Sequence, residues 1–272
     1  MTIFEAVILG FVQSLTEFLP VSSSAHLIIL PKILGWDDHS LTIDLVLHLG
    51  TSLALIVFFG KDLWNIITHF CYDVFYNSFK NREIKFSSHT KFGFYLLVGS
   101  IPAVLFGLTF GSYIEENVRD LRLIAAFMTI GTFLMAIAEY KVRKKTVFKE
   151  VGYFKALFIG FFQSLALLPG VSRSGATISG GILNGLSRED SARFAFLLAL
   201  PVILGAAAIQ ITKDYKLILD NIYPASAAFL ASFIFGLFAL KLLMIFLKKG
   251  TLIPFIIYRI ILIISLLFFT IR

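Results

Sequence analysis

The sequence predicts an all-α integral membrane protein, an inverted-topology repeat with six full spans and two re-entrant helical hairpins. Hydrophobic residues make up 58% of the 272 positions and charged residues only 15%, whereas soluble domains are about one quarter charged. Long apolar runs recur along the chain. A third observation is internal repetition, because GFVQSL at residues 10–15 returns as GFFQSL at residues 160–165. We therefore expect a single membrane domain over residues 1–272, with repeat halves at about 1–140 and 151–272.

Six apolar runs have the length and composition of membrane-spanning helices. They cover residues 45–59, 94–110, 121–138, 194–211, 225–247 and 252–271. Each half then contributes three spans and one hairpin that enters and leaves on the same side. Because three is an odd number, the second half is inverted relative to the first.

Basic residues predict which side faces the cytoplasm. Roughly fifteen Lys and Arg side chains fall in the loops at 61–91, 141–155 and 248–249, together with Arg188, against about six on the other side. Short loops rich in Lys and Arg stay cytoplasmic. The hairpin of the first half therefore enters from the outer face and that of the second half from the cytoplasmic face, so their tips meet near the bilayer midplane.

The polar tip of the first hairpin carries a carboxylate and an imidazole. Gln13 and Glu17 lie four residues apart and share one helix face, and Pro20 predicts that this helix ends just before it. Hydroxyl groups follow, which favour a new helix start that binds anions. The residues of this new start are Ser22, Ser23, Ser24 and His26.

The second tip has the same helix break and serine-rich helix start, but it carries a guanidinium group. Pro169 and Gly170 break the helix, and the next helix start brings Ser172, Arg173, Ser174 and, one turn on, Thr177. Arginine suits bidentate phosphate recognition. Its burial at membrane depth costs at least about 2.5–3.5 kcal/mol, so it needs an anionic partner such as Glu17 or a ligand. The two tips together predict a shared phosphate site.

Simpler interpretations exist for the individual residues. A Leu-Pro step followed by serines is often only a kinked membrane helix, and a Glu17–Arg173 bridge can be structural. Asp44 and His48 share a helix face, where we favour a packing role. For Arg259 we expect a role in neutralising charge or binding carbonyl groups inside the bundle. Complementary charges at equivalent repeat positions favour the shared site over the simpler interpretations.

Three function classes remain open from the residues alone. Broken helices that meet at the midplane are typical of secondary transporters as well as of enzymes, so a lipid transporter is the main alternative, and a membrane scaffold is the weakest one. The net charge of +7 lies in short loops that set topology, and this excludes nucleic acid as a partner. The single cysteine, Cys71, excludes an intrachain disulfide.

At these residues the chain resembles the undecaprenyl-pyrophosphate phosphatase family, the bacitracin-resistance proteins of bacterial membranes. The resemblance rests on residues 15–26 and 169–181, with further likeness at 44–51, 101–103 and 253–259. It implies hydrolysis of undecaprenyl pyrophosphate in the bacterial plasma (inner) membrane, with calcium or magnesium as cofactor. We expect the active site to open to the outer face, because the hairpin of Glu17 is the one predicted to enter from there. The partners implied are this substrate and the lipid bilayer, with a homodimer as an open alternative to a monomer.

The resemblance also maps the site residues. The Glu/Gln-x-x-x-Glu motif falls on Gln13 and Glu17, which are the metal candidates, although many members have a second glutamate at position 13. The catalytic candidates are Glu17, Ser23, His26 and Arg173, and the substrate-binding candidates are Ser22, Ser24, Ser172, Ser174 and Thr177. Ala25 replaces a glycine of the family pattern. Pyrophosphate cleavage needs positive charge and an activated nucleophile. We expect Ser23 as the nucleophile, activated by His26 or Glu17, with a metal-bound water as its rival.

Overall fold

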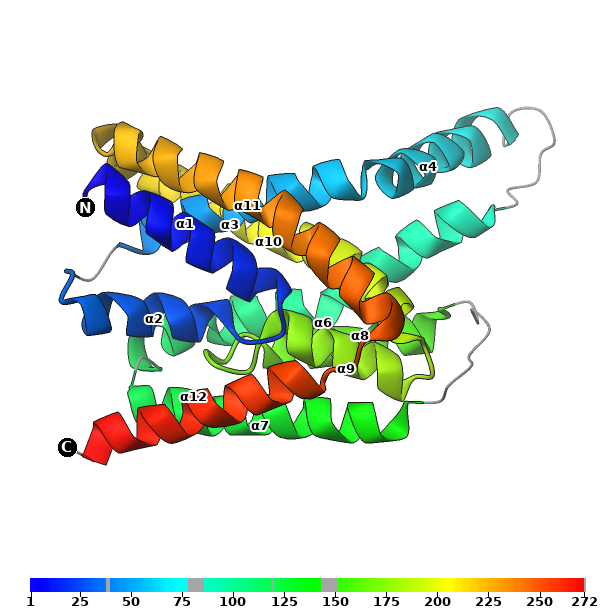
Figure 1. Ribbon diagram of the computed structural model, residues 1–272. Helices are drawn as coiled ribbons and strands as arrows, with labels where there is room; N and C mark the ends of the chain where they lie inside the picture. The colour runs from blue at the N-terminus through cyan, green and yellow to red at the C-terminus, as the bar shows by residue number, and fades with distance from the viewer. Residues whose placement is uncertain (38–39, 78–85, 119, 143–150, 272) are drawn as a thin grey trace.

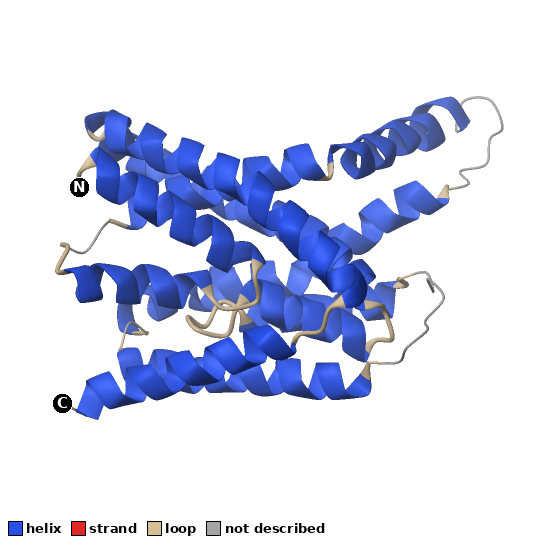
Figure 2. Ribbon diagram, viewed as in Figure 1, coloured by secondary structure: helices blue, strands red, loops and turns tan. Residues whose placement is uncertain are grey.

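The computed structural model describes residues 1–37, 40–77, 86–118, 120–142 and 151–271, and this part of the chain is helical, without strands (Figures 1 and 2). The first half contains α1 (Ile3–Phe18), α2 (Ser23–Leu34), α3 (Leu41–Phe58), α4 (Gly60–Cys71), the π-helix η1 (Tyr72–Asn77), α6 (Ser88–Asn117) and α7 (Leu121–Lys141). The second half contains α8 (Tyr153–Leu165), α9 (Arg173–Leu183), α10 (Arg188–Asp220), α11 (Ile222–Lys249) and α12 (Ile253–Ile271).

The described helices confirm an all-α membrane protein. Four of them, α6, α7, α10 and α11, are long and apolar enough to cross a membrane. A fifth span is added if α3 and α4 count as one span that is bent by 71°. The described apolar part of α12, Ile253–Phe268, is shorter. Six full spans therefore stay a prediction.

The two hairpins enter the bundle from opposite ends. In Figure 1, α1 begins and α2 ends on the side where both chain termini lie, whereas α8 begins and α9 ends on the opposite side. The loops that connect each pair lie next to each other in the interior (Figure 2), and α1 contacts α9. The polar segments of the two halves therefore meet in the middle of the bundle.

Each hairpin turns through a serine in an unusual backbone conformation. α1 ends before Pro20, as predicted, and α2 follows after Ser22, which has φ 79°. Ser172, which precedes α9, has φ 75°. Positive φ is uncommon for residues other than glycine, and among the described residues only these two serines show it outside glycine. Such strain clusters at functional sites, and its recurrence at equivalent positions supports a duplicated unit.

The glycines of the repeated GFxQSL segment allow close helix packing in both halves. A methyl group built on Gly10 of α1 would lie 2.6 Å from the Cβ of Ala231 on α11. One built on Gly160 of α8 would collide with the backbone carbonyl of Gly99 on α6. Small residues that let backbones approach are the usual basis of helix contacts in membranes. α1 thus packs on α11 in the same way that α8 packs on α6.

Candidate active site

The turn between α1 and α2 brings a serine hydroxyl onto a buried carboxylate. Glu17, in the last turn of α1, is only 8% exposed. Ser23, the first residue of α2, donates a hydrogen bond of 2.6 Å from Oγ to Glu17 Oε2. The positive φ of Ser22 reverses the chain between them. A hydroxyl that donates to a carboxylate is the starting arrangement for removal of its proton by a general base.

Arg173 faces the same carboxylate from the other hairpin. It begins α9, at the position equivalent to Ser23 in the repeat, and its Nη1 atom lies 3.9 Å from Glu17 Oε1. This distance makes an ion pair but exceeds a hydrogen bond. Nη1 is buried and makes no hydrogen bond with any described residue. A guanidinium group beside a serine–carboxylate pair, with a buried donor unused, is prepared for an anionic ligand.

Gln13 joins the carboxylate to a histidine that the sequence analysis assigned to packing. Its Nε2 atom lies 3.3 Å from Glu17 Oε2 and 3.1 Å from Nδ1 of His48 on α3. His48 Nδ1 is itself 3.8 Å from Glu17 Oε2. The preference for a packing role of His48 is thus not supported, since its ring belongs to this cluster. Gln13 and Glu17 form a polar face on α1, and this face was the sequence signal that a polar side chain of a neighbouring helix contacts it.

His26 makes its hydrogen bonds with groups other than the serine–carboxylate pair. Its Nδ1 atom lies 2.7 Å from the carbonyl oxygen of Ser22, and its Nε2 atom lies 2.6 Å from the hydroxyl of Tyr258 on α12. The two rings are stacked, with centroids 5.7 Å apart. Both ring nitrogens are therefore engaged, and the hydrogen-bond partner of Ser23 in this structure is Glu17. Tyr258 was not among the predicted site residues, and its only signal in the sequence was its place in the family-like segment 253–259.

Two of the predicted substrate-binding serines tie the hairpin tips together. The backbone N–H of Gly170 donates to Ser24 Oγ (3.3 Å), and Ser174 Oγ donates to the backbone carbonyl of Leu19 (3.3 Å). Ser24 and Ser174 are equivalent positions of the repeat, so each tip holds the backbone of the other. The structure thus gives them a scaffold contact beside the site.

The remaining hydroxyl groups mostly serve their own helices. Ser172 Oγ accepts from the backbone N–H of Gly175 (3.1 Å) and so caps α9. Thr177 donates to the carbonyl of Arg173 (2.6 Å) within the same helix. Ser22 Oγ lies 3.3 Å from Ser24 Oγ. Ser23 is therefore the predicted hydroxyl that contacts the buried carboxylate.

Arg259 fixes the second tip from α12. Its Nη2 atom donates to the carbonyl oxygens of Met128 (2.9 Å), Gly170 (2.8 Å) and Val171 (3.2 Å), and its Nε atom donates to Thr132 Oγ1 (2.8 Å). The side chain is fully buried. This confirms the predicted role of Arg259 as a donor to carbonyl groups inside the bundle. It holds the chain directly before Arg173 against α7.

A small cavity lies beside the cluster. The two hairpins contribute Glu17, Phe18, Arg173, Ser174 and Thr177 to its lining. The other wall comes from the neighbouring helices α3 and α10, with Thr51, Leu55, Ala195, Phe196, Ala199 and Ile203.

The cluster also offers oxygen ligands for a hard cation. Gln13 Oε1 is buried and accepts no hydrogen bond from the described residues, and Glu17 supplies a carboxylate next to it. Within the described part of the chain, no group of three or more His, Cys, Asp or Glu side chains is placed to hold a metal. Mg²⁺ commonly binds one or two carboxylates and completes its shell with substrate phosphate oxygens and water. The residues fit a cation that binds together with the substrate.

Fold and site define the class: a multi-pass α-helical membrane protein whose interior carboxylate, serine and arginine are arranged for phosphate chemistry. Residues 6–265 match the family described as bacitracin resistance protein BacA, and the chain belongs to this family. Similar proteins named undecaprenyl-diphosphatase include one from Chlorobium phaeobacteroides, 40% identical over 96% of this chain and 95% of the relative. Those from Chlorobium phaeovibrioides (39% identical, 95% and 94%) and Thermobifida fusca (38% identical, 96% and 87%) carry the same name.

Proposed function

We propose that this protein hydrolyses undecaprenyl pyrophosphate to undecaprenyl phosphate and inorganic phosphate. The reaction recycles the lipid carrier of cell-wall synthesis, and removal of the pyrophosphate form confers bacitracin resistance. The observation that carries the proposal is the hydrogen bond from Ser23 to the buried Glu17, with the unused donor of Arg173 beside it. Membership of the family and the activity named for its relatives support it.

In the first chemical step, Ser23 Oγ attacks the terminal phosphorus of the pyrophosphate. The Oγ proton passes to Glu17 as the new oxygen–phosphorus bond forms. The bond between this phosphorus and the bridging oxygen breaks, so undecaprenyl phosphate leaves and phosphoserine remains. Arg173 binds the phosphoryl oxygens, whose charge it stabilises during the transfer.

In the second step, water attacks the phosphorus of phosphoserine. Glu17 first releases to solvent the proton that it took from Ser23. It then accepts a proton from the attacking water and passes it to Ser23 Oγ, inorganic phosphate leaves, and the serine hydroxyl is restored. His48 and Gln13 contact the far side of the site and hold the carboxylate in place. His26, in its contact with Tyr258, positions the start of α2.

A divalent cation, calcium or magnesium, is part of this proposal. Glu17 and the unpartnered oxygen of Gln13 would hold it, and it would neutralise charge on the pyrophosphate oxygens. The serine–carboxylate pair needs no other group in order to remove the hydroxyl proton. Direct attack by a bound water remains the competing mechanism.

One experiment tests both the function and the nucleophile. Purified protein in detergent, supplied with undecaprenyl pyrophosphate labelled at the terminal phosphate, should release labelled inorganic phosphate. A transporter would leave the substrate intact, because no sealed membrane exists in detergent. A sample quenched within one turnover should carry acid-stable label on the protein, and the Ser23→Ala variant should carry none. Release of phosphate without labelled protein would instead establish attack by water.

The arrangement in the membrane is part of the same proposal. We infer six spans, two re-entrant hairpins and two inverted repeat halves in the bacterial plasma membrane, with the site open to the outer face. The entry of the hairpins from opposite ends (Figure 1) and the matching backbone at Ser22 and Ser172 support this arrangement. The basic residues favour the cytoplasm for the end where α11 finishes and α12 begins. A homodimer stays a prediction.

Cysteine labelling tests the orientation. In a Cys71→Ser background, Ser40→Cys should react with a membrane-impermeant maleimide added to intact cells. Lys248→Cys, at the basic end of α11, should react only after the cells are opened. The reverse pattern would place the site at the cytoplasmic face, and labelling of both from outside would exclude the proposed topology.

A further inference from the structure

The bend after α3 leads the chain into an amphipathic helix. α4 departs from α3 by 71° and contains no buried residue. Its exposed apolar side chains are spaced along one face at Trp64 (67% exposed), Ile67 (56%) and Phe70 (40%). Lys61 and Asp62 occupy its first turn. A helix of this type lies in the interface between lipid headgroups and hydrocarbon, here at the end of the bundle with the basic loops.

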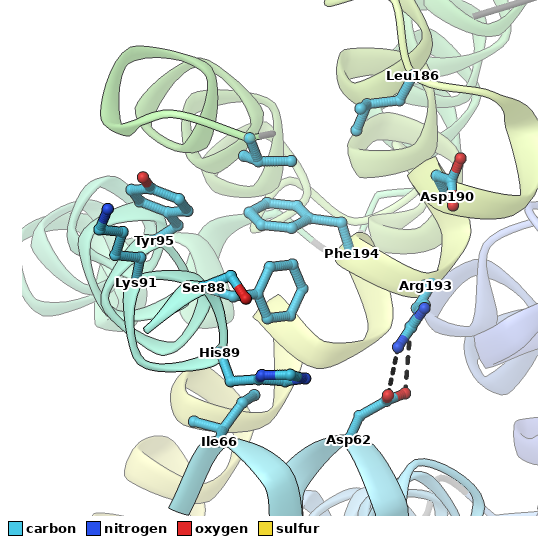
Figure 3. A pocket seen from close by; sticks show the side chains of 12 residues that line it. Asp62, Ile66, Ser88, His89, Lys91, Tyr95, Leu186, Asp190, Arg193 and Phe194 are labelled. Carbon is cyan, nitrogen blue, oxygen red and sulfur yellow. Dashed lines mark hydrogen bonds and ion pairs between the residues drawn. The ribbon is translucent and has the colours of Figure 1, made fainter. Parts of the chain in front are cut away.

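A cavity of about 420 Å³ lies between α4, the start of α6 and the start of α10 (Figure 3). It is separate from the cluster at Glu17. Its inner wall is apolar and aromatic, with Phe92 and Phe194 in edge-to-face contact at 5.8 Å between centroids, next to Val151 and Leu186. Cavities of this volume hold small ligands. Its wall includes Asp62 and Ile66 of α4, so the opening is at the depth of the headgroups.

The charged groups that line the cavity are balanced. Arg193 on α10 forms an ion pair with Asp62 on α4, shown by dashed lines in Figure 3, and these two charges neutralise each other. Lys91, Asp190 and His89 remain, and Figure 3 shows Lys91 beside Tyr95 at one end and Asp190 toward the other. The His89 ring stacks on His69, with centroids 4.4 Å apart. Asp190 Oδ2 accepts a hydrogen bond from Ser187 Oγ (2.6 Å), and neither Lys91 nor Asp190 has an ion-pair partner within the described residues. The cavity therefore presents one cation and one anion at its two ends, with aromatic rings between them.

We propose that this cavity binds the headgroup of a zwitterionic phospholipid of the cytoplasmic leaflet, with phosphoethanolamine as its chemistry. The phosphate lies at Lys91, and the ammonium lies at Asp190 and over the aromatic rings, which attract cations. The first methylenes of the lipid contact Val151, Leu186 and Ile66. An anionic lipid without an amine would leave Asp190 facing negative charge. The proposal does not depend on the reaction at Glu17.

Binding to the delipidated full-length protein in detergent tests the proposal. Native mass spectrometry with dioleoyl phosphatidylethanolamine and dioleoyl phosphatidylglycerol should give a Kd about tenfold lower for the ethanolamine lipid, the size of one charge-assisted hydrogen bond. Asp190→Asn should abolish this preference, and Lys91→Gln should weaken binding of both lipids. Lys241→Gln, on the exposed face of α11, is the matched control and should bind like the wild type.

Lys91 is exposed, and Asp190→Asn keeps an oxygen that can accept the hydrogen bond from Ser187 at the start of α10. The melting temperatures of the variants and their phosphate release in detergent should therefore match those of the wild type. Equal Kd values for the two lipids in the wild type, or a preference for phosphatidylglycerol, would overturn the proposal. An unchanged preference in the Lys91→Gln/Asp190→Asn double variant would place the lipid elsewhere. Soluble glycerophosphoethanolamine should compete at least about tenfold more weakly than the lipid, and equal competition would point to a soluble ligand instead.

Discussion

Replacing Arg173 by alanine is expected to lower kcat/KM by about a thousandfold or more, the range found when a charged donor to a transferring phosphoryl group is removed. The Nη1 atom of Arg173 is buried without a hydrogen bond and lies 3.9 Å from Glu17 Oε1. The Nη1 donor takes no part in capping a helix, so it is available to bind the substrate. Its loss also leaves the carboxylate of Glu17 without its cation.

The matched comparison is Arg173→Lys, which keeps the charge but loses the planar, bidentate donor. We expect it to recover part of the activity. Arg193→Ala, which removes an arginine paired with Asp62 away from the site, should leave phosphate release in detergent near the wild-type value. The measurement is the initial rate of phosphate release over a range of substrate concentrations. Arg173→Ala activity within about tenfold of wild type would exclude the shared site, because such a loss is only one hydrogen bond in size.

Replacing Glu17 by glutamine should have the second large effect. The change conserves size, but the amide cannot take the Ser23 proton, and loss of a general base typically costs about 10²–10⁴-fold in rate. The loss should fall mainly on kcat, since Glu17 acts in the transfer step, and only partly on KM. Glu17→Gln also removes the ion-pair partner of Arg173, so the melting temperature of the variant must be measured alongside the rate.

A double-variant cycle separates this chemistry from damage to the fold. If Glu17 and Arg173 serve one reaction, the Glu17→Gln/Arg173→Ala variant should be far more active than the product of the two single losses predicts. Glu5→Gln, at the exposed start of α1, serves as the carboxylate control with unchanged rate. Fully multiplicative losses would mean that the two side chains act at independent sites.

Local rules explain why the hairpins were predictable. Pro20 and Pro169–Gly170 disfavour helix, and the serines that follow favour the next helix start, so the combination located the breaks in short segments. Proline alone would not have done so, because Pro31, Pro102 and Pro201 lie inside helices. Arg259 could be assigned to carbonyl groups because a guanidinium inside a bundle has few other partners. The duplicated GFxQSL segment located the equivalent positions.

Contacts between distant helices were not predictable in the same way. His48 on α3 reaches Gln13 on α1, and Tyr258 on α12 takes up the ring nitrogen of His26. Helix periodicity gives the face of a residue but not the helix that faces it. The 71° bend between α3 and α4 was likewise hidden, since residues 45–59 end in an apolar stretch without proline.

The hydrogen bonds between the two hairpin tips determine how the site responds to the thickness of the membrane. In the proposed topology the two hairpins enter from opposite faces of the bilayer, so a thinner or thicker hydrocarbon layer would shift them relative to each other if each followed its own leaflet. Ser24 holds the backbone of Gly170, and Ser174 holds that of Leu19, which makes the two tips one body. When the apolar length of the helices differs from the thickness of the hydrocarbon layer, the outer helices then tilt and the tips keep their relative position. The separation of Glu17 and Arg173 becomes a property of the protein and not of the membrane's thickness.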